Sequence, residues 1–187
     1  MNLKNKTVLF LGSSVTYGSA AGGVSFADFL GEKLSLRVIK EAVSGTCLGD
    51  VNDASYVARL KRVDPSTHVD LVVCQLSTND ARLGIGLETV AAAIRYIARY
   101  VDQTFACPLV FYTGTRYDSP AYGAMISLLY ELQAECGFEI LDLWNDPELC
   151  SVSPADYRRY MRDPVHPTLD GYRLWWTPKF IDFLNSL

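Results

Sequence analysis

The stretch VDLVVCQL at residues 69–76 is the most hydrophobic part of the chain, and it constrains the fold most strongly. Its apolar residues do not alternate with polar ones, as they would in a strand with one face in water. A run of this kind suits a central strand of a parallel sheet, which is buried on both faces. Parallel strands are joined by right-handed crossovers, usually through helices, so the run predicts an α/β fold with helices on both sides of a sheet.

The rest of the chain alternates between strand and helix patterns. Short β-rich runs predict strands at residues 7–11, 36–43, 69–76, 109–113 and 139–143. Apolar residues at helical spacing predict helices at residues 26–34, 54–62, 87–104 and 122–136, and a last helix from Thr168 onward that Pro178 kinks or breaks. Since 187 residues is the size of one domain, we expect residues 1–187 to form a single three-layer α/β/α sandwich with a five-stranded parallel sheet.

The charge balance and the cysteines exclude several classes of function. The chain has 17 Lys and Arg against 21 Asp and Glu, a net charge of −4, so we expect no binding to nucleic acid or to an anionic membrane. The five cysteines are widely spaced and form no C-x-x-C pair, which disfavours a disulfide scaffold and a zinc site. No segment predicts a membrane span or a signal peptide. These features predict a cytoplasmic protein, without stable membrane association, that acts on a small uncharged molecule.

The loop after the first predicted strand carries a serine in a position suited to catalysis. Ligands of an open parallel sheet bind beyond the carboxyl ends of its strands, and Gly12-Ser13-Ser14-Val15 follows such an end. The loop lacks both the lysine of a Walker phosphate loop and the second glycine of G-x-G-x-x-G. The Ser14 hydroxyl can act there as a nucleophile, with backbone N–H groups nearby for an oxyanion. A turn in which serine only caps a helix explains the stretch equally well.

A serine nucleophile needs a base, and the chain offers His68 and His166. His68 precedes a predicted strand, at the wrong end of a parallel sheet for catalysis. His166 follows the last predicted strand in the stiff segment DPVHP at residues 163–167. Asp163 can accept a hydrogen bond from one ring nitrogen and leave the other to face Ser14, although helix capping explains Asp163 when it is considered alone.

Two other strand-end loops supply possible oxyanion donors. Asn79 follows the most hydrophobic strand, and its side-chain amide can donate into the site, although Asn-Asp is also a common turn pair. Gly45 follows the second predicted strand. It either forms a turn or brings a backbone N–H close to the substrate.

Together these blocks resemble the SGNH hydrolases, also called GDSL-type esterases and lipases. The family's G-D-S-[LIV] block is similar to residues 12–15, its glycine block to Gly45, its G-x-N-D block to residues 77–80 and its D-x-x-H block to residues 163–166. The resemblance extends from Gly12 to the final helix. Ser13 replaces the usual aspartate and Ser77 the usual glycine. Neither departure alters a triad or oxyanion residue, but that at Ser77 could change loop geometry and substrate approach.

The resemblance implies a flavodoxin-like SGNH hydrolase fold and a carboxylic ester hydrolase that needs no metal and no cofactor. It carries over the role of nucleophile to Ser14, of general base to His166 and of orienting acid to Asp163. It also implies an oxyanion hole made by the backbone N–H groups of Ser14 and Gly45 and by the side chain of Asn79.

The sequence constrains the substrate less. Side chains that follow strand ends could contact it, and these are Tyr17, Arg82, Tyr112, Arg116 and Tyr117. Because strands and helices use most of the chain, no long insertion remains for a lid. We therefore expect an open site that prefers short acyl esters, above all acetyl esters, of a sugar or another small polyol.

Several alternatives remain open at this stage. Within the family, the chain could be a lysophospholipase or thioesterase, or a catalytically silent relative that binds glycans. From another class, a flavodoxin-like module could hold a phosphate or a flavin at the first loop, but it would leave Asn79, Asp163 and His166 without a role. Trp175 and Trp176 in the last predicted helix are expected to pack in the core. If one of these side chains is partly exposed, it could form a contact in a homo-oligomer.

Overall fold

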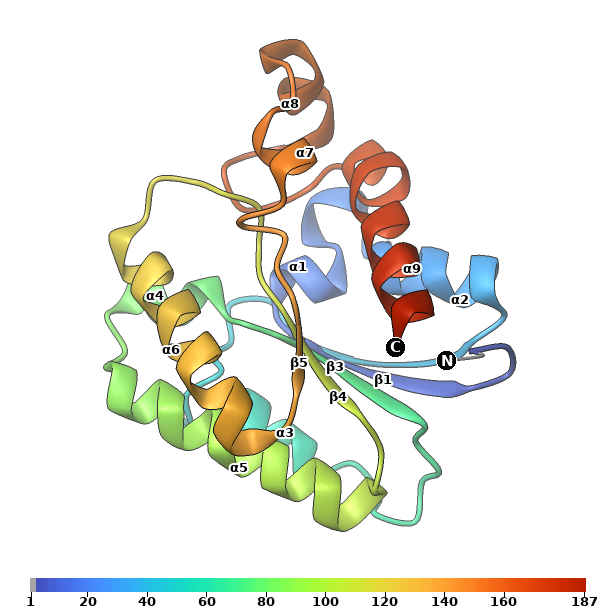
Figure 1. Ribbon diagram of the computed structural model, residues 1–187, viewed down its shortest axis with the longest axis vertical. Helices are drawn as coiled ribbons and strands as arrows, with labels where there is room; N and C mark the ends of the chain where they lie inside the picture. The colour runs from blue at the N-terminus through green and yellow to red at the C-terminus, as the bar shows by residue number, and fades with distance from the viewer. Residues whose placement is uncertain (1–2) are drawn as a thin grey trace.

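A five-stranded parallel sheet forms the centre of the molecule in the computed structural model, which describes residues 3–187 (Figure 1). Its strands are β1 (Thr7–Gly12), β2 (Arg37–Ala42), β3 (Leu71–Gln75), β4 (Leu109–Tyr112) and β5 (Glu139–Leu141), in the spatial order β2-β1-β3-β4-β5. All four neighbouring pairs are parallel. The predicted α/β class and the five predicted strands are confirmed, and each strand end lies within two residues of its predicted place.

The central strand β3 shows why this part of the sequence must be apolar. Its side chains alternate between the two faces of the sheet, and both faces are covered. Val72 and Cys74 belong to the hydrophobic core on one face, whereas Leu71 and Val73 belong to the core on the other. All four are completely buried, so a polar residue on either face of β3 would lose its contact with water.

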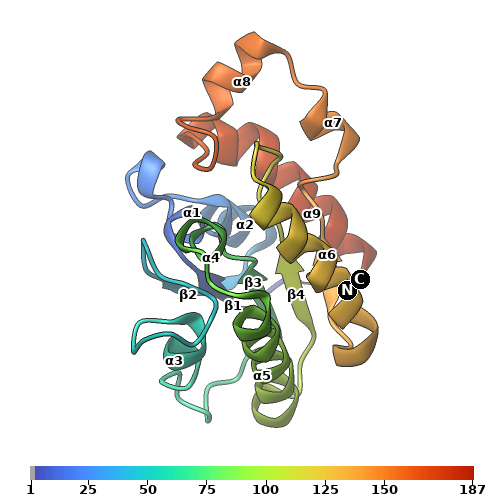
Figure 2. The same ribbon diagram turned by 90° about the vertical axis from the view of Figure 1, so that its left-hand side faces the viewer.

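Helices form a layer on each face of the sheet (Figures 1 and 2). One layer consists of α3 (Tyr56–Leu60), α5 (Leu87–Phe105) and α6 (Pro120–Cys136), and the other of α2 (Phe26–Leu34) and α9 (Thr177–Ser186). The predicted helices at residues 26–34, 87–104 and 122–136 are confirmed, while that at residues 54–62 is present in the shorter form of α3. Within residues 3–187, no helix combines the length and the hydropathy needed to cross a membrane.

The predicted C-terminal helix is present, but it is not broken at Pro178. Residues 169–186 are helical throughout, and a π-helical segment at Gly171–Trp176 leads directly into α9. Pro178 is the second residue of α9, directly after the π-helical segment. The helical backbone therefore continues through the proline.

Four short helices lie beyond the carboxyl ends of the strands. Two of them, α1 (Ser14–Tyr17) and α4 (Thr78–Leu83), begin almost directly after β1 and β3. The other two, α7 (Pro147–Cys150) and α8 (Pro154–Tyr160), project beyond this edge of the sheet between β5 and Asp163 (Figures 1 and 2). This two-helix excursion was not predicted, because we expected the strands and helices to leave no long insertion for a lid.

Candidate active site

Three side chains from two distant parts of the chain form a hydrogen-bonded row at the carboxyl edge of the sheet. The Oγ atom of Ser14, the first residue of α1, lies 2.8 Å from Nε2 of His166. On the other side of the imidazole, Nδ1 lies 2.8 Å from Oδ2 and 3.0 Å from Oδ1 of Asp163. The predicted serine, histidine and aspartate thus have the mutual geometry of a nucleophile, a base and the acid that orients the base.

The Asp163 side chain also holds the segment around His166 in place. The Oδ1 atom of Asp163 accepts hydrogen bonds from the backbone N–H groups of Val165, at 2.8 Å, and His166, at 2.9 Å. Partial burial raises the pKa of the Asp163 carboxyl, but these hydrogen bonds and the imidazole outweigh it and leave the pKa below its ordinary value. Asp163 is therefore a carboxylate at neutral pH and can stabilise an imidazolium.

The turn that presents Ser14 depends on close packing around Gly12. A Cβ atom on Gly12 would lie 1.7 Å from Oγ1 of Thr16 and 2.8 Å from Oε1 of Gln75, so no larger residue fits here. Oε1 of Gln75 accepts from the backbone N–H of Ser13 at 2.9 Å, from its hydroxyl at 3.2 Å and from Oγ1 of Thr16 at 2.9 Å. Ser13, the departure from the family's aspartate, is thus anchored by β3.

The glycine and asparagine loops are tied to each other. Nδ2 of Asn79 donates to the carbonyl oxygen of Thr46 at 2.9 Å, directly after Gly45, whose φ of +81° is a conformation that favours glycine. The Asp80 carboxylate accepts from the backbone N–H groups of Leu48 and Gly49, both at 2.8 Å. These contacts bring the Gly45 loop and the start of α4 together at the sheet edge.

Ser77 has a structural role of its own. It is the N-cap of α4, and its hydroxyl accepts a hydrogen bond from the backbone N–H of Asn79 at 3.2 Å. A glycine at this position would lack that hydroxyl. The second departure from the family pattern therefore caps the helix that carries Asn79.

A small cavity of about 250 Å³ lies beside this row of side chains. Its wall is formed by Thr78, Asn79, Arg82, Tyr117, Asp118, Ser119, Val165 and His166, all of which except Val165 carry a polar group. Arg82, a predicted substrate contact, and Tyr117, from the loop after β4, are among them. Asp118 and Ser119 were missed because a polar pair in a loop carries no periodic signal.

Three other predicted substrate contacts do not line this cavity. Tyr112 is wrong as a contact because it is completely buried, with its hydroxyl 2.6 Å from Oγ1 of Thr16. Arg116 donates to Oδ1 of Asn145 and lines a separate hollow between the loop after β4 and α8. Tyr17 is 44% exposed on the surface and is absent from the cavity wall.

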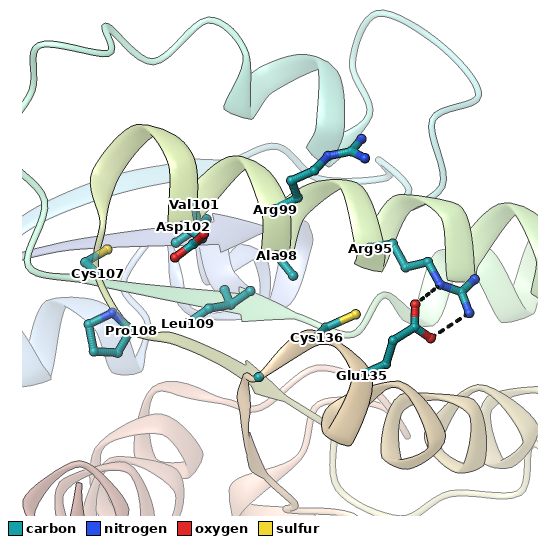
Figure 3. A pocket seen from close by; sticks show the side chains of 11 residues that line it. Arg95, Ala98, Arg99, Val101, Asp102, Cys107, Pro108, Leu109, Glu135 and Cys136 are labelled. Atoms are coloured by element: carbon teal, nitrogen blue, oxygen red, sulfur yellow. Dashed lines mark hydrogen bonds and ion pairs between the residues drawn. The ribbon is translucent and has the colours of Figure 1, made fainter.

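A larger hollow lies at the opposite edge of the sheet (Figure 3). It measures about 540 Å³ and lies between the ends of α5 and α6 and the start of β4, with an Arg95–Glu135 ion pair of 2.7 Å at one side. Ligands of parallel α/β sheets bind at the other edge, so we assign the chemistry to the smaller cavity. Within residues 3–187, no group of three or more His, Cys, Asp and Glu side chains is arranged to hold a metal ion.

The match to a protein family agrees with this geometry. The model of the GDSL-like Lipase/Acylhydrolase family matches residues 10–174, which include all four sequence blocks. The chain belongs to this family. It is therefore a carboxylic ester hydrolase, and the alternative of a phosphate- or flavin-binding module is excluded. No curated protein matches the sequence.

Solved structures of similar fold cover almost the whole chain. A protein from Lactobacillus plantarum has a TM-score of 0.82 at 19% identity, with 98% of both chains covered. A member of the lipolytic protein G-D-S-L family from Veillonella parvula has a TM-score of 0.75 at 15% identity and covers 97% of this chain and 100% of its own. Axe2, an acetylxylan esterase from Geobacillus stearothermophilus, has a TM-score of 0.73 at 18% identity and covers 97% and 95%. The TM-scores show that this GDSL-type hydrolase has the same fold as these proteins.

Proposed function

We propose that this GDSL-type hydrolase is a serine esterase with the triad Ser14, His166 and Asp163. The observation that carries the proposal is the continuous row from Ser14 Oγ through the His166 imidazole to the Asp163 carboxylate, with 2.8 Å at each junction. Ser14 attacks the acyl carbon of the ester while His166 takes its proton. His166 then returns that proton to the leaving alcohol, and an acyl group remains on Ser14.

A water molecule completes the cycle by the same route. His166 accepts a proton from the water as it attacks the acyl-enzyme, and the proton goes back to Ser14 Oγ when the carboxylic acid leaves. In both halves of the reaction, negative charge develops on the carbonyl oxygen. The backbone N–H groups of Ser14 and Gly45 and the side chain of Asn79 are the proposed donors to that oxyanion.

Replacing Asn79 by alanine should lower kcat by roughly 10² to 10³, the usual loss for one oxyanion donor, with little change in KM. The reason is that the amide binds charge that exists only in the transition state. Steady-state kinetics on an acetyl ester measures both constants. Asn145→Ala, a change at an exposed asparagine in the loop after β5, is the control and should keep the wild-type kcat. A change confined to KM in Asn79→Ala would mark Asn79 as a ground-state binding residue instead.

For the substrate, we propose acetyl or other short acyl esters of a sugar or another small polyol. The size of the cavity, about 250 Å³, supports a small acyl group, and the side chains of Arg82, Asp118 and Ser119 in its wall suit hydroxyl groups. Among the proteins of similar fold are acetylxylan esterases and a family two carbohydrate esterase, although identity to this chain is 18% or less. The five cysteines, all free of disulfide bonds, support the further proposal of a cytoplasmic location.

The two-helix excursion offers a second place where an acyl chain could bind, so the acyl preference of the enzyme distinguishes between the two hollows. A second hollow of about 510 Å³, with Leu149, Val152 and Trp175 in its wall, lies beneath α7 and α8 and shares no lining residue with the small cavity. An acyl chain that reached it could gain about 0.8 kcal/mol per buried CH₂. An acyl chain confined to the small cavity could bury only its first few carbons.

We expect kcat/KM for p-nitrophenyl esters to be highest for acetate or butyrate and to fall for octanoate and palmitate, because the small cavity holds few methylenes. Acetylated sugars should be hydrolysed and lysophospholipids should not. A maximum at octanoate or longer would contradict the proposal. It would place the acyl chain in the larger hollow and favour a lysophospholipase or thioesterase.

A further inference from the structure

A buried arginine lies beneath the loops of the site. Arg59, in α3, is 5% exposed, and no carboxylate of residues 3–187 lies within ion-pair distance of it. Its guanidinium group donates only to uncharged oxygen atoms, and burial lowers its pKa. Since an unpaired buried charge is costly, simple packing of α3 against the sheet does not account for an arginine here.

The acceptors of Arg59 belong to the two loops that carry the nucleophile and the glycine. Nη2 donates to the carbonyl oxygen of Gly12 at 2.7 Å and to Oγ1 of Thr46 at 3.2 Å. Nη1 donates to the carbonyl oxygen of Glu41, near the end of β2, and Nε donates to that of Ala54 at 3.1 Å. One rigid group therefore spans the ends of β1 and β2 and the loop that follows β2.

The contact with Gly12 fixes the peptide that leads into the nucleophile. The carbonyl oxygen of the Gly12–Ser13 peptide accepts from Arg59, and the N–H of the same peptide donates to Oε1 of Gln75 at 2.9 Å. This peptide unit can therefore rotate in neither direction without breaking a buried hydrogen bond. Ser14 follows it directly.

The contact with Thr46 links the same guanidinium to the proposed oxyanion donors. Thr46 follows Gly45, and its carbonyl oxygen accepts the side-chain amide of Asn79 at 2.9 Å. Arg59 thus links the Ser14 turn to Thr46, which follows Gly45 in the chain and accepts a hydrogen bond from Asn79. The distance between nucleophile and donors matters because catalysis is lost when reacting groups are displaced by an ångström.

We propose that Arg59 is a positioning residue, which sets the spacing between the Ser14 nucleophile and the oxyanion donors at Gly45 and Asn79. This inference rests on the proposed serine esterase mechanism. Arg59 does not touch the substrate. The guanidinium group has five N–H donors in one plane, so it can donate to both loops at once. The single ammonium group of a lysine cannot reproduce this geometry.

The test compares Arg59→Met and Arg59→Lys with the wild-type enzyme on an acetyl ester. We expect Arg59→Met to lower kcat by about 10- to 100-fold, as for a small misplacement of reacting groups, with KM within about twofold of wild type. Arg59→Lys should lose less, because it keeps a donor and the charge but cannot bridge both loops. Thr46→Val, which removes one acceptor, should show a smaller fall in kcat with the same unchanged KM.

The control separates positioning from stability. Val57→Ala lies in the same helix and removes buried apolar contacts but no hydrogen bond to the Ser14 turn, so it should lower Tm and keep the wild-type kcat. If Arg59→Met does not fold, Arg59→Lys and Thr46→Val carry the test. Wild-type kcat in folded Arg59→Lys and Thr46→Val would overturn the inference, and so would a loss of kcat in Val57→Ala as large as theirs. A wild-type enzyme without esterase activity would contradict the proposed function itself.

Discussion

Replacing Ser14 by alanine is expected to lower kcat for ester hydrolysis by about 10⁴- to 10⁶-fold, the loss seen when a hydrolase loses its nucleophile. The variant removes the proposed attacking oxygen, while the proposed oxyanion donors stay in place. Only one hydrogen bond is lost from the fold, that with His166 at 2.8 Å, so the free energy of unfolding should change by no more than about 1.5 kcal/mol. Steady-state kinetics and a thermal melt measure the two effects.

A fluorophosphonate probe gives an independent readout of the same residue. It should label the wild-type enzyme at Ser14, identified by mass spectrometry of the labelled peptide, and should not label Ser14→Ala. Ser19→Ala, a change at an exposed serine just beyond α1, should be labelled and active like the wild type. Labelling of a different serine, or wild-type turnover by Ser14→Ala, would show that another residue attacks the ester.

The sequence predicted the sheet well because burial on two faces leaves a strong signal. The apolar run of β3 requires cover on both sides, and short runs with the same character mark the other strands. The excursion of α7 and α8 was missed because helices of one or two turns show no apolar period. Their start signals are present, since Asp146 precedes Pro147 and Ser153 precedes Pro154 and both cap their helices.

The candidate site was predictable as far as each residue follows the end of a strand. Ser14 and Asn79 do, and parallel strands bring such residues to one edge. His166 comes only after α7 and α8, and its hydrogen bond with Ser14 shows that the chain returns to that edge. Gln75 and Arg59 were not predictable in this way. From sequence alone, a glutamine in an apolar strand has no evident role, and an arginine in a helix is expected to face solvent. The partner of Gln75, Ser13, lies 62 residues away in the chain, and that of Arg59, Gly12, lies 47 residues away.

Tyr112 shows a different limit of sequence reasoning. It lies at the carboxyl end of β4, where substrate contacts are expected, but its side chain is directed into the core with Phe26 and Phe180. A one-residue shift in a strand moves a side chain to the opposite face. The sequence places a residue at a strand end more reliably than it says which way that residue points.

Replacing Asp163 by asparagine is expected to lower kcat by roughly 10² to 10⁴, with 10⁴ the effect of such a change in a well-shielded triad. The Oδ1 atom accepts from the backbone N–H groups of Val165 and His166, so the asparagine oxygen should keep that place. Its NH₂ group would then face Nδ1 of His166 and donate to it, which moves the imidazole proton to Nε2. In that tautomer Nε2 cannot take the proton of Ser14. Steady-state kinetics should show the loss in kcat, with KM little changed.

The partial exposure of Asp163, 46% for its side chain, makes the size of this effect informative. Water that reaches the pair can partly stabilise the imidazolium in place of the carboxylate, so a loss nearer 10² would reflect that access. Asp170→Asn is the matched control. Asp170 is a half-exposed aspartate that pairs with Arg159 at 2.9 Å, so its substitution should leave kcat unchanged. If Asp163→Asn keeps wild-type activity while His166→Ala loses it, Asp163 has no orienting role. The reaction would then depend on a Ser14–His166 dyad.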